Sequence, residues 1–301
     1  MGPTATGKTD AAAQCTESFA SEIISVDSSL VYRDMNIGTA KPDDDFLAKY
    51  PHHLVNVRHP NDTYSVADFY TDCTNLITDI VNQGKVPVLA GGTMFYFNCL
   101  ENGLSDLPAA DPSLRAAIEL EAQSTGWEKQ HARLMALDPM NAQRIETTDT
   151  QRIQRGLEIV LSSGKTIAEL NETRKPPVTN PMMKVALAFS DRSVLHDRIA
   201  RRFDIMLDKG LDQEVQSLLD QGVDSAASSM RMIGYRQMLE YLQNDLTFSE
   251  MRLKGIAATR QLAKRQLTWL RNQSNVVWWV DHGLETAEFD LLIETIRKKI
   301  A

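Results

Sequence analysis

A glycine-rich loop at the start of the chain constrains the fold more than any other feature of the sequence. Residues 2–9 read G-P-T-A-T-G-K-T and match the phosphate-binding pattern G-x-x-x-x-G-K-[ST] at every fixed position. The glycines let successive backbone N–H groups turn toward an anion, Lys8 adds a positive charge, and the Thr9 hydroxyl can ligate Mg²⁺. The pattern predicts a diphosphate or triphosphate site formed by Gly2, Pro3, Thr4, Ala5, Thr6, Gly7, Lys8 and Thr9.

The loop also predicts a class of fold, because such loops join a buried strand to a helix. Only Met1 precedes it here, so we expect the sheet to lack that strand and to lose buried apolar area and stability. Downstream, β-branched runs at 22–27 and 85–90 alternate with a helical pattern at 66–81, which begins with a capping box of Ser65 and Asp68. This order predicts an α/β fold with a P-loop NTPase-like parallel sheet flanked by helices.

The pattern changes between two groups of prolines. Residues 112–124, 127–137 and 150–163 show helical periodicity, and no strand pattern separates them. We therefore predict an inserted all-helical domain at 108–179, with 1–107 and 180–301 forming one discontinuous core. In the second part of that core, strands are predicted at 183–189 and 276–280 and helices at 193–207, 211–221, 231–242 and 249–272.

Composition indicates an ordinary globular protein. The chain has 301 residues, of which 43% are hydrophobic, and this is enough for a sizeable core. No stretch approaches the roughly 18 apolar residues of a membrane helix, so we expect no membrane partner and a cytosolic protein. Cys15, Cys73 and Cys99 have no C-x-x-C spacing, which argues against a disulfide framework and a zinc site.

The charge distribution is uneven along the chain. The net charge is −8, yet residues 252–280 contain six cations and no aspartate or glutamate. This segregation favours an anionic partner, although a solvated helix face is the alternative explanation.

Two polar residues follow predicted strands, at the edge where parallel sheets bind ligands. Asp27 can hold Mg²⁺ through water or accept a proton from a nucleophile, and its alternative role is to cap the turn at Ser28 and Ser29. Thr93 follows two glycines, so it can contact a phosphate or merely cap the next helix. The polar loop at 36–42, N-I-G-T-A-K-P, is interpreted as a surface connection.

Seven motifs in order make the chain similar to a known family. They are G-P-T-A-T-G-K-T, S-V-D-S-S-L-V-Y, N-I-G-T-A-K-P, A-G-G-T-M-F-Y, D-T-Q-R-I-Q-R, R-M-I-G-Y-R and A-T-R-Q-L-A-K-R-Q-L-T-W-L-R. With them the chain resembles the bacterial tRNA dimethylallyltransferases nearly from end to end. The resemblance implies transfer of a dimethylallyl group from its diphosphate to the N6 amine of the adenosine on the 3′ side of the anticodon, with release of pyrophosphate. It implies Mg²⁺ as cofactor, a tRNA anticodon stem-loop as partner and a monomeric protein.

The resemblance also assigns site residues. It implies that Asp27 takes the proton of the amine, that Thr93 orients the phosphates, and that Thr9 holds the metal. It further implies that the target base is flipped out of the anticodon loop. The positions that match tRNA-contacting stretches are Asp27, Ser28, Ser29, Leu30, Thr93, Arg115, Gln151, Arg152, Ile153, Gln154, Arg155, Arg231, Met232, Ile233, Gly234, Tyr235, Arg236, Arg260, Lys264, Arg265, Gln266, Leu267, Thr268, Trp269, Leu270 and Arg271.

Three other functions share part of this pattern. A small-molecule kinase also uses the loop and an acid after the second strand, but it consumes ATP. An adenylate isopentenyltransferase uses the same donor on free AMP, although the inserted helices and the acid-free cationic segment favour tRNA over it. An RNA-binding module with an inactive loop would need neither Lys8 nor Asp27 for chemistry.

Overall fold

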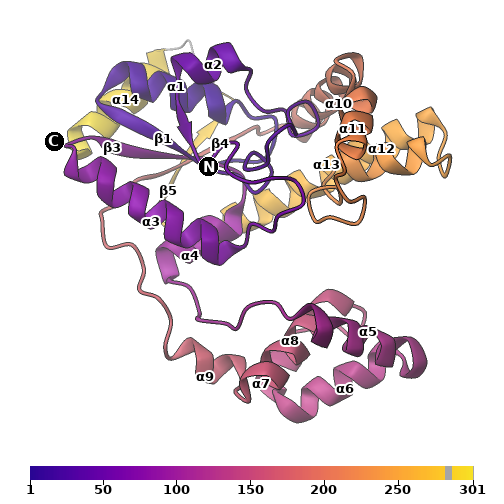
Figure 1. Ribbon diagram of the computed structural model, residues 1–301. Helices are drawn as coiled ribbons and strands as arrows, with labels where there is room; N and C mark the ends of the chain where they lie inside the picture. The colour runs from indigo at the N-terminus through magenta and orange to yellow at the C-terminus, as the bar shows by residue number, and fades with distance from the viewer. Residues whose placement is uncertain (282–286, 301) are drawn as a thin grey trace. The chain divides into compact units, whose positions relative to one another are not determined.

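The computed structural model describes residues 1–281 and 287–300. The chain divides into two compact units, Met1–Asn98 with Thr179–Ala301, and Cys99–Val178. The first unit contains all the strands described and the second contains helices (Figure 1). Across these residues no helix combines the length and the apolar composition needed to cross a bilayer.

The strands of the first unit run parallel. In one sheet β1 (Ser21–Val26) lies between β2 (His52–His53) and β3 (Val86–Gly91). In the other, β4 (Lys184–Ala188) pairs with β5 (Val276–Val280). Ile23, Ile24 and Val26 of β1 are buried, as expected for a strand that is covered on both faces. The α/β fold with parallel strands flanked by helices is confirmed, and the strands form two separate sheets.

The first two residues lie between the two sheets. The Met1 amino group donates to Val185 O at 2.7 Å, and Leu187 N–H donates to Met1 O at 2.9 Å. A Cβ added to Gly2 would lie 2.7 Å from Leu187 O, and one added to Gly92 would lie 3.3 Å from Gly2 O. Met1 and Gly2 therefore lie between β4 and the turn that follows β3, where the two sheets adjoin.

Helices cover both sides of the strands. In Figure 1, α1 (Lys8–Ser18) and α14 (Ala287–Ile300) lie on one side, and α3 (Val66–Asn82) lies on the other. The first side is apolar, because α1, β4 and α14 contribute one cluster of buried residues, namely Ala11, Leu187, Phe289, Leu292 and Ile293. On the other side Phe69 of α3 stacks on Tyr96 of α4 (Met94–Asn102), with ring centroids 4.0 Å apart.

The caps of α3 confirm the prediction from sequence. Ser65 accepts from Asp68 N–H, and the Asp68 carboxylate accepts from Ser65 N–H, which forms the expected capping box. The other helices of this unit are α2 (Asp44–Lys49), α10 (Arg192–Asp208), α11 (Leu211–Asp220), α12 (Tyr235–Leu242) and α13 (Phe248–Arg271).

Helix α12 begins later than the predicted residue 231. Gly234 has φ of 94°, which is outside the helical region, and it serves as the N-cap. The preceding residues therefore form a turn rather than a helical face.

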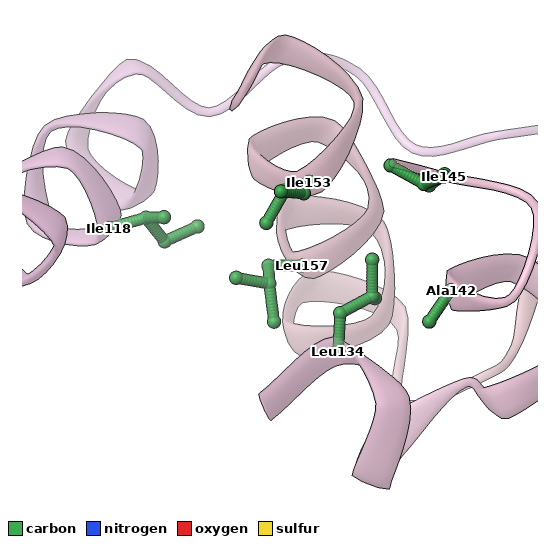
Figure 2. Packing of buried hydrophobic residues seen from close by; sticks show 6 residues of the cluster. All are labelled: Ile118, Leu134, Ala142, Ile145, Ile153 and Leu157. Atoms are coloured by element: carbon green, nitrogen blue, oxygen red, sulfur yellow. The ribbon is translucent and has the colours of Figure 1, made fainter. Parts of the chain in front are cut away.

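The second unit is a small helical bundle. Its helices are α5 (Pro112–Thr125), α6 (Trp127–Leu137), α7 (Pro139–Ala142), α8 (Thr150–Ser163) and α9 (Ile167–Asn171). The three predicted helices are confirmed, whereas α7 and α9 are too short to show a periodicity. Figure 2 shows the buried side chains that α5, α6, α8 and the α7 region bring together, which are Ile118, Leu134, Ala142, Ile145, Ile153 and Leu157.

Replacing a central member of this cluster is expected to destabilise the bundle. Leu157 is fully buried, so Leu157→Ala removes apolar contacts and leaves a cavity that costs about 2 to 5 kcal/mol of unfolding free energy. Leu120→Ala is the matched control, because Leu120 is 69% exposed on α5. Urea unfolding followed by tryptophan fluorescence, to which Trp127 beside the cluster contributes, measures both. Equal effects of the two variants would contradict this description of the core.

Candidate active site

A cavity of about 450 Å³ lies in the first unit where β1 and β3 end. Val26 and Gly91, the last residues of these two strands, are register partners, so the segments that follow them start side by side. The cavity is lined by parts of the glycine-rich loop at 2–9, by residues 27–30, by Gly92 and Thr93, and by one face each of α10 and α13. The predicted convergence of polar residues at this sheet edge is confirmed.

The glycine-rich loop at 2–9 bends sharply just before α1. Ala5 and Gly7 have φ of 65° and 83°, and α1 begins directly afterwards at Lys8. The Thr6 hydroxyl and the Lys8 ammonium both donate to Pro3 O, at 2.9 and 2.6 Å. These bonds close the loop on itself and place the positive end of α1 beside the cavity.

Two side chains from distant elements hold the loop backbone. Gln266 of α13 accepts from Thr4 N–H at 2.9 Å and donates to Gly92 O at 2.8 Å. Arg198 of α10 donates to Ala5 O at 2.8 Å. The loop, the turn after β3 and the two long helices are thus joined by hydrogen bonds.

The cavity carries more buried positive than negative charge. Burial lowers the pKa of Lys8 to about 8, and the nearby Asp27 carboxylate opposes this shift. Burial also lowers the pKa of Arg202 on α10, again against the effect of Asp27. In the described part of the chain Arg202 has neither an ion pair nor a hydrogen bond. A partly buried guanidinium without a partner is costly, so the cavity is suited to an anionic ligand.

The lowered pKa of Lys8 predicts pH-dependent binding of inorganic pyrophosphate. Because the pKa of the free protein lies below the ordinary 10.5, Lys8 loses its charge as the pH rises through about 8, whereas a bound anion would keep it protonated. The affinity should then fall by up to about tenfold per pH unit above pH 8. Calorimetry from pH 7 to 9.5 measures this relative to Lys8→Met, so that titration of pyrophosphate itself cancels. A ratio of affinities that does not change with pH would be inconsistent with the role of Lys8.

Asp27 and Thr93 share a hydrogen-bonded turn. Asp27 Oδ1 accepts from Ser29 N–H at 2.9 Å and from the Ser29 hydroxyl at 2.6 Å. Thr93 Oγ1 accepts from Ser28 N–H at 3.0 Å, and Thr93 N–H donates to Val26 O. Both residues line the cavity. The capping role and the functional role of Asp27 are compatible, because capping uses one carboxylate oxygen.

An apolar surface adjoins the charged part of the cavity. Ile199, Phe203 and Met206 line it from the same face of α10 as Arg202. The turn before α12 adds Met232 and Ile233, and the aromatic rings of Phe95 and Trp269 are 50% and 39% exposed. The site can therefore accept a ligand that joins an anionic group to a hydrocarbon.

Comparison with known proteins identifies the family of the chain. The family model for IPP transferase matches residues 30–273. The chain belongs to the IPP transferase family. A full-length tRNA isopentenylpyrophosphate transferase from Bacillus halodurans is 35% identical, with 99% of this chain and 94% of that chain covered and a TM-score of 0.71.

Two other solved structures agree. A tRNA delta(2)-isopentenylpyrophosphate transferase from Staphylococcus epidermidis is 31% identical over 99% of this chain and 97% of that chain, with a TM-score of 0.70. A eukaryotic dimethylallyltransferase acting on tRNA is 27% identical over 98% of this chain and 76% of that chain, with a TM-score of 0.80.

Only some of the residues predicted to contact tRNA in this family member reach the cavity. Those that line it are Asp27, Ser28, Ser29, Leu30, Thr93, Met232, Ile233, Tyr235, Arg265, Gln266 and Trp269. Lys264, Thr268 and Arg271 lie on exposed parts of α13, and Arg231 and Arg236 flank the turn before α12 on the surface. Arg260 is only partly exposed, and its buried Nε has no acceptor in the residues described.

Some residues of the matching stretches have buried side chains. Ile153, Tyr235 and Leu270 are 0% exposed, and Tyr235 nevertheless lines the cavity. Gln266 is also buried, and its amide is committed to the loop and to Gly92.

The cationic segment is less uniform than its sequence suggests. Arg252 forms a two-pronged ion pair with Asp204 of α10, at 2.6 and 2.8 Å, and Lys254 lies 3.9 Å from Glu240 of α12. Acids from other helices thus neutralise the first part of the segment. Within residues 1–281 and 287–300, no ion pair involves Arg260, Lys264, Arg265 or Arg271, so the unpaired cations of the segment lie in its second part.

In the second unit, two predicted tRNA contacts are organised by a buried acid. Glu158 of α8 is fully buried and accepts from Arg115 at 3.0 and 3.1 Å and from Arg155 at 2.6 Å. Arg115 and Arg155 remain 43% and 33% exposed at their side chains. Gln151 and Arg152, at the start of α8, are exposed, and Gln154 donates to Arg115 O.

Arg202 is the main site residue that sequence reasoning missed. Its signal was present, because Ile199, Arg202, Phe203 and Met206 recur at helical spacing and place a cation on the apolar face of α10. Such an exception to an amphipathic pattern marks a buried charge, and buried charges need a partner or a ligand.

Proposed function

We propose that this protein transfers the dimethylallyl group of dimethylallyl diphosphate to the N6 amine of the adenosine 3′ of a tRNA anticodon, as a monomer, and releases pyrophosphate. The observation that carries the proposal is the cavity in which the loop, the unpaired Arg202 and Asp27 converge in a member of the IPP transferase family. The relatives named above act on tRNA, which supports tRNA as the acceptor.

The donor end of the proposal rests on charge. Loop residues 2–9 would bind the diphosphate as a loop of the P-loop NTPase type, while Lys8 and Arg202 neutralise the charge that grows on it as the allylic C–O bond breaks. Their positive charges are already in place beside Asp27, and neither side chain forms an ion pair in the residues described, so little reorganisation is needed when the ligand binds.

The residues present also fit Mg²⁺. The described residues contain no group of three His, Cys, Asp or Glu side chains that could hold a metal ion alone. The Thr9 hydroxyl and the Asp27 carboxylate both line the cavity, and Mg²⁺ in phosphate sites is held by one or two protein oxygens together with substrate phosphates and waters. Thr9 would be its protein ligand, and the metal would supply further stabilisation of the leaving diphosphate.

The acceptor end rests on Asp27 and Thr93. Both Ser29 bonds fall on Asp27 Oδ1, and no hydrogen bond to Oδ2 is found in residues 1–281 and 287–300. We assign Oδ2 as the base that removes a proton from the adenosine amine. Thr93, fixed by its bonds to Ser28 and Val26, would orient the phosphates.

Binding of tRNA is assigned to cations of both units. In the second unit these are Arg115, Arg152 and Arg155, and in the first unit they are Lys264, Arg265 and Arg271 on α13. Their side chains are exposed or partly exposed, as phosphate contacts require. Since a base stacked in the anticodon loop cannot reach an enclosed site, the target adenosine would be flipped out of its stack.

Nucleoside mass analysis tests the proposed function. The protein is incubated with Mg²⁺, dimethylallyl diphosphate and an anticodon stem-loop whose 3′ neighbour of the anticodon is adenosine, with and without ATP. We expect one adenosine to gain a C5H8 unit at a rate that does not depend on ATP, and no product on free AMP. An unmodified stem-loop, or a product that forms only with ATP, would rule the proposal out.

The salt dependence of stem-loop binding tests the α13 surface. Each phosphate contact contributes about 0.7 to 0.9 to the slope of log affinity against log salt concentration. Replacing Lys264 and Arg265 together by Gln should reduce that slope by about 1 to 2, as measured by filter binding at 50 to 300 mM KCl. Lys209→Gln, which removes an exposed cation after α10, is the control. An unchanged slope in the double variant would mean that Lys264 and Arg265 do not contact RNA phosphates and only face solvent.

A further inference from the structure

One carboxylate in the first unit holds a whole wall of the cavity. Glu214 of α11 accepts four hydrogen bonds, from Asn36 N–H at 2.8 Å, Ile37 N–H at 2.7 Å, Gly38 N–H at 3.0 Å and the Tyr235 hydroxyl at 2.6 Å. Three consecutive backbone N–H groups converge on it, as they do around bound anions. Glu214 therefore joins the loop at 36–38 to the start of α12.

The wall is also fixed at its other end and by close packing. Lys41 donates to Tyr32 O at 2.6 Å, to Asn36 Oδ1 at 2.9 Å and to Asn56 Oδ1 at 2.6 Å. A Cβ added to Gly38 would lie 2.5 Å from the Tyr235 ring, which the bond to Glu214 prevents from moving. The loop that the sequence presented as a surface connection is thus tightly held.

This wall adjoins the part of α10 that carries Arg202. Gly38, Thr39, Ala40 and Tyr235 line the cavity together with Met206. A Cβ added to Gly234 would lie 3.6 Å from Gly38 O and 3.7 Å from Met206 Cε, so these three groups meet at one place. Met206 lies one helical turn from Arg202, and the wall is therefore placed where the hydrocarbon attached to a bound diphosphate would extend.

We propose that Glu214 is a positioning residue that fixes the wall against which the hydrocarbon of the prenyl diphosphate packs. The inference rests on the proposed function for the identity of the ligand. Glu214 acts through the loop at 36–40 and through Tyr235, and it does not touch the diphosphate end, which is held by other elements. Loosening it should affect recognition of the prenyl group and leave recognition of pyrophosphate intact.

Glu214→Gln tests this positioning role. The substitution keeps the side-chain volume, but it removes the negative charge of the carboxylate and one of its two acceptor oxygens. We expect calorimetry to show about tenfold weaker binding of dimethylallyl diphosphate and unchanged binding of inorganic pyrophosphate. The KM for the donor should rise in parallel, with the KM for the stem-loop unchanged. Asp212→Asn, which removes an exposed acid from the same helix, should leave all these values at the wild-type level.

A second variant protects the test against misfolding. Tyr235→Phe removes one of the four bonds to Glu214 and should give the same selective effect at smaller size, about threefold. Equal loss of donor and pyrophosphate binding in both variants would mean general disruption of the cavity and would overturn the inference. A raised KM for the stem-loop with unchanged donor binding would overturn it in favour of an acceptor wall. If the wild-type protein binds dimethylallyl diphosphate but transfers nothing, the proposed function fails. The role of Glu214 is still decided in that case, by the ratio of the binding constants for dimethylallyl diphosphate and inorganic pyrophosphate.

Discussion

Asp27→Asn is expected to abolish most turnover while leaving tRNA affinity unchanged. The amide keeps the acceptor oxygen that Ser29 N–H and its hydroxyl use, so the turn at 27–29 is preserved. It cannot accept the proton of the N6 amine, and loss of a general base slows a reaction by about 10² to 10⁴. Single-turnover transfer with saturating donor measures the chemical step, and filter binding of the stem-loop measures the affinity.

A matched control for Asp27 exists elsewhere in the chain. Asp191, the N-cap of α10, also accepts from the N–H and the hydroxyl of the serine two residues later, although there the N–H bonds to Oδ1 and the hydroxyl to Oδ2, and it is exposed and does not line the cavity. Asp191→Asn should leave single-turnover transfer at the wild-type rate. If Asp27→Asn instead weakens stem-loop binding and transfers bound substrate at nearly the normal rate, then Asp27 is a contact and not a base.

Arg202→Gln is expected to reduce kcat/KM for the donor and to increase the stability of the free protein. Losing a partly buried cation that would pair with the diphosphate should cost about 2 to 5 kcal/mol, or roughly thirtyfold to several-thousandfold in kcat/KM. In the free protein the same guanidinium has no ion pair or hydrogen bond within the described chain, so its removal relieves a desolvated charge. A loss of function together with a gain in stability would indicate that Arg202 serves ligand binding rather than folding.

The neighbouring arginine separates this effect from a general loss of charge. Arg201 is exposed on the same helix, and Arg201→Gln should change neither kcat/KM nor the urea midpoint beyond small surface effects. If both variants lose the same activity, the long-range field of α10 is responsible. If Arg202→Gln destabilises the free protein, Arg202 has a structural role.

Local signals in the sequence predicted much of this fold. The capping box at Ser65, the strand that ends before Asp27 and the helix starting at Thr150 lie where their patterns place them, because each is determined by residues close to it in the chain. The late start of α12 was not predicted correctly. It depends on a glycine with φ of 94°, a backbone feature that hydrophobic periodicity does not report.

The site was predictable in its polar residues and less so in its supports. The loop, Asp27 and Thr93 were found because each stands at a recognisable junction of strand and helix. Gln266, Arg198 and Glu214 act through bonds that span more than 170 residues, and no local spacing indicates such partners. The motifs also did not indicate which residues of a matching helix are buried. Ile153 and Leu270 are buried, because each matching stretch contains both inward-facing and outward-facing residues.

A crystal structure of the protein with pyrophosphate and Mg²⁺ tests the central claim most directly, because pyrophosphate is the product that the cavity would retain. We predict phosphate oxygens within hydrogen-bond distance of the N–H groups of residues 4–9, of Lys8 Nζ and of the Arg202 guanidinium, with Asp27 facing the open side of the ligand. Pyrophosphate bound outside this cavity, or bound in it without Arg202, would contradict the account.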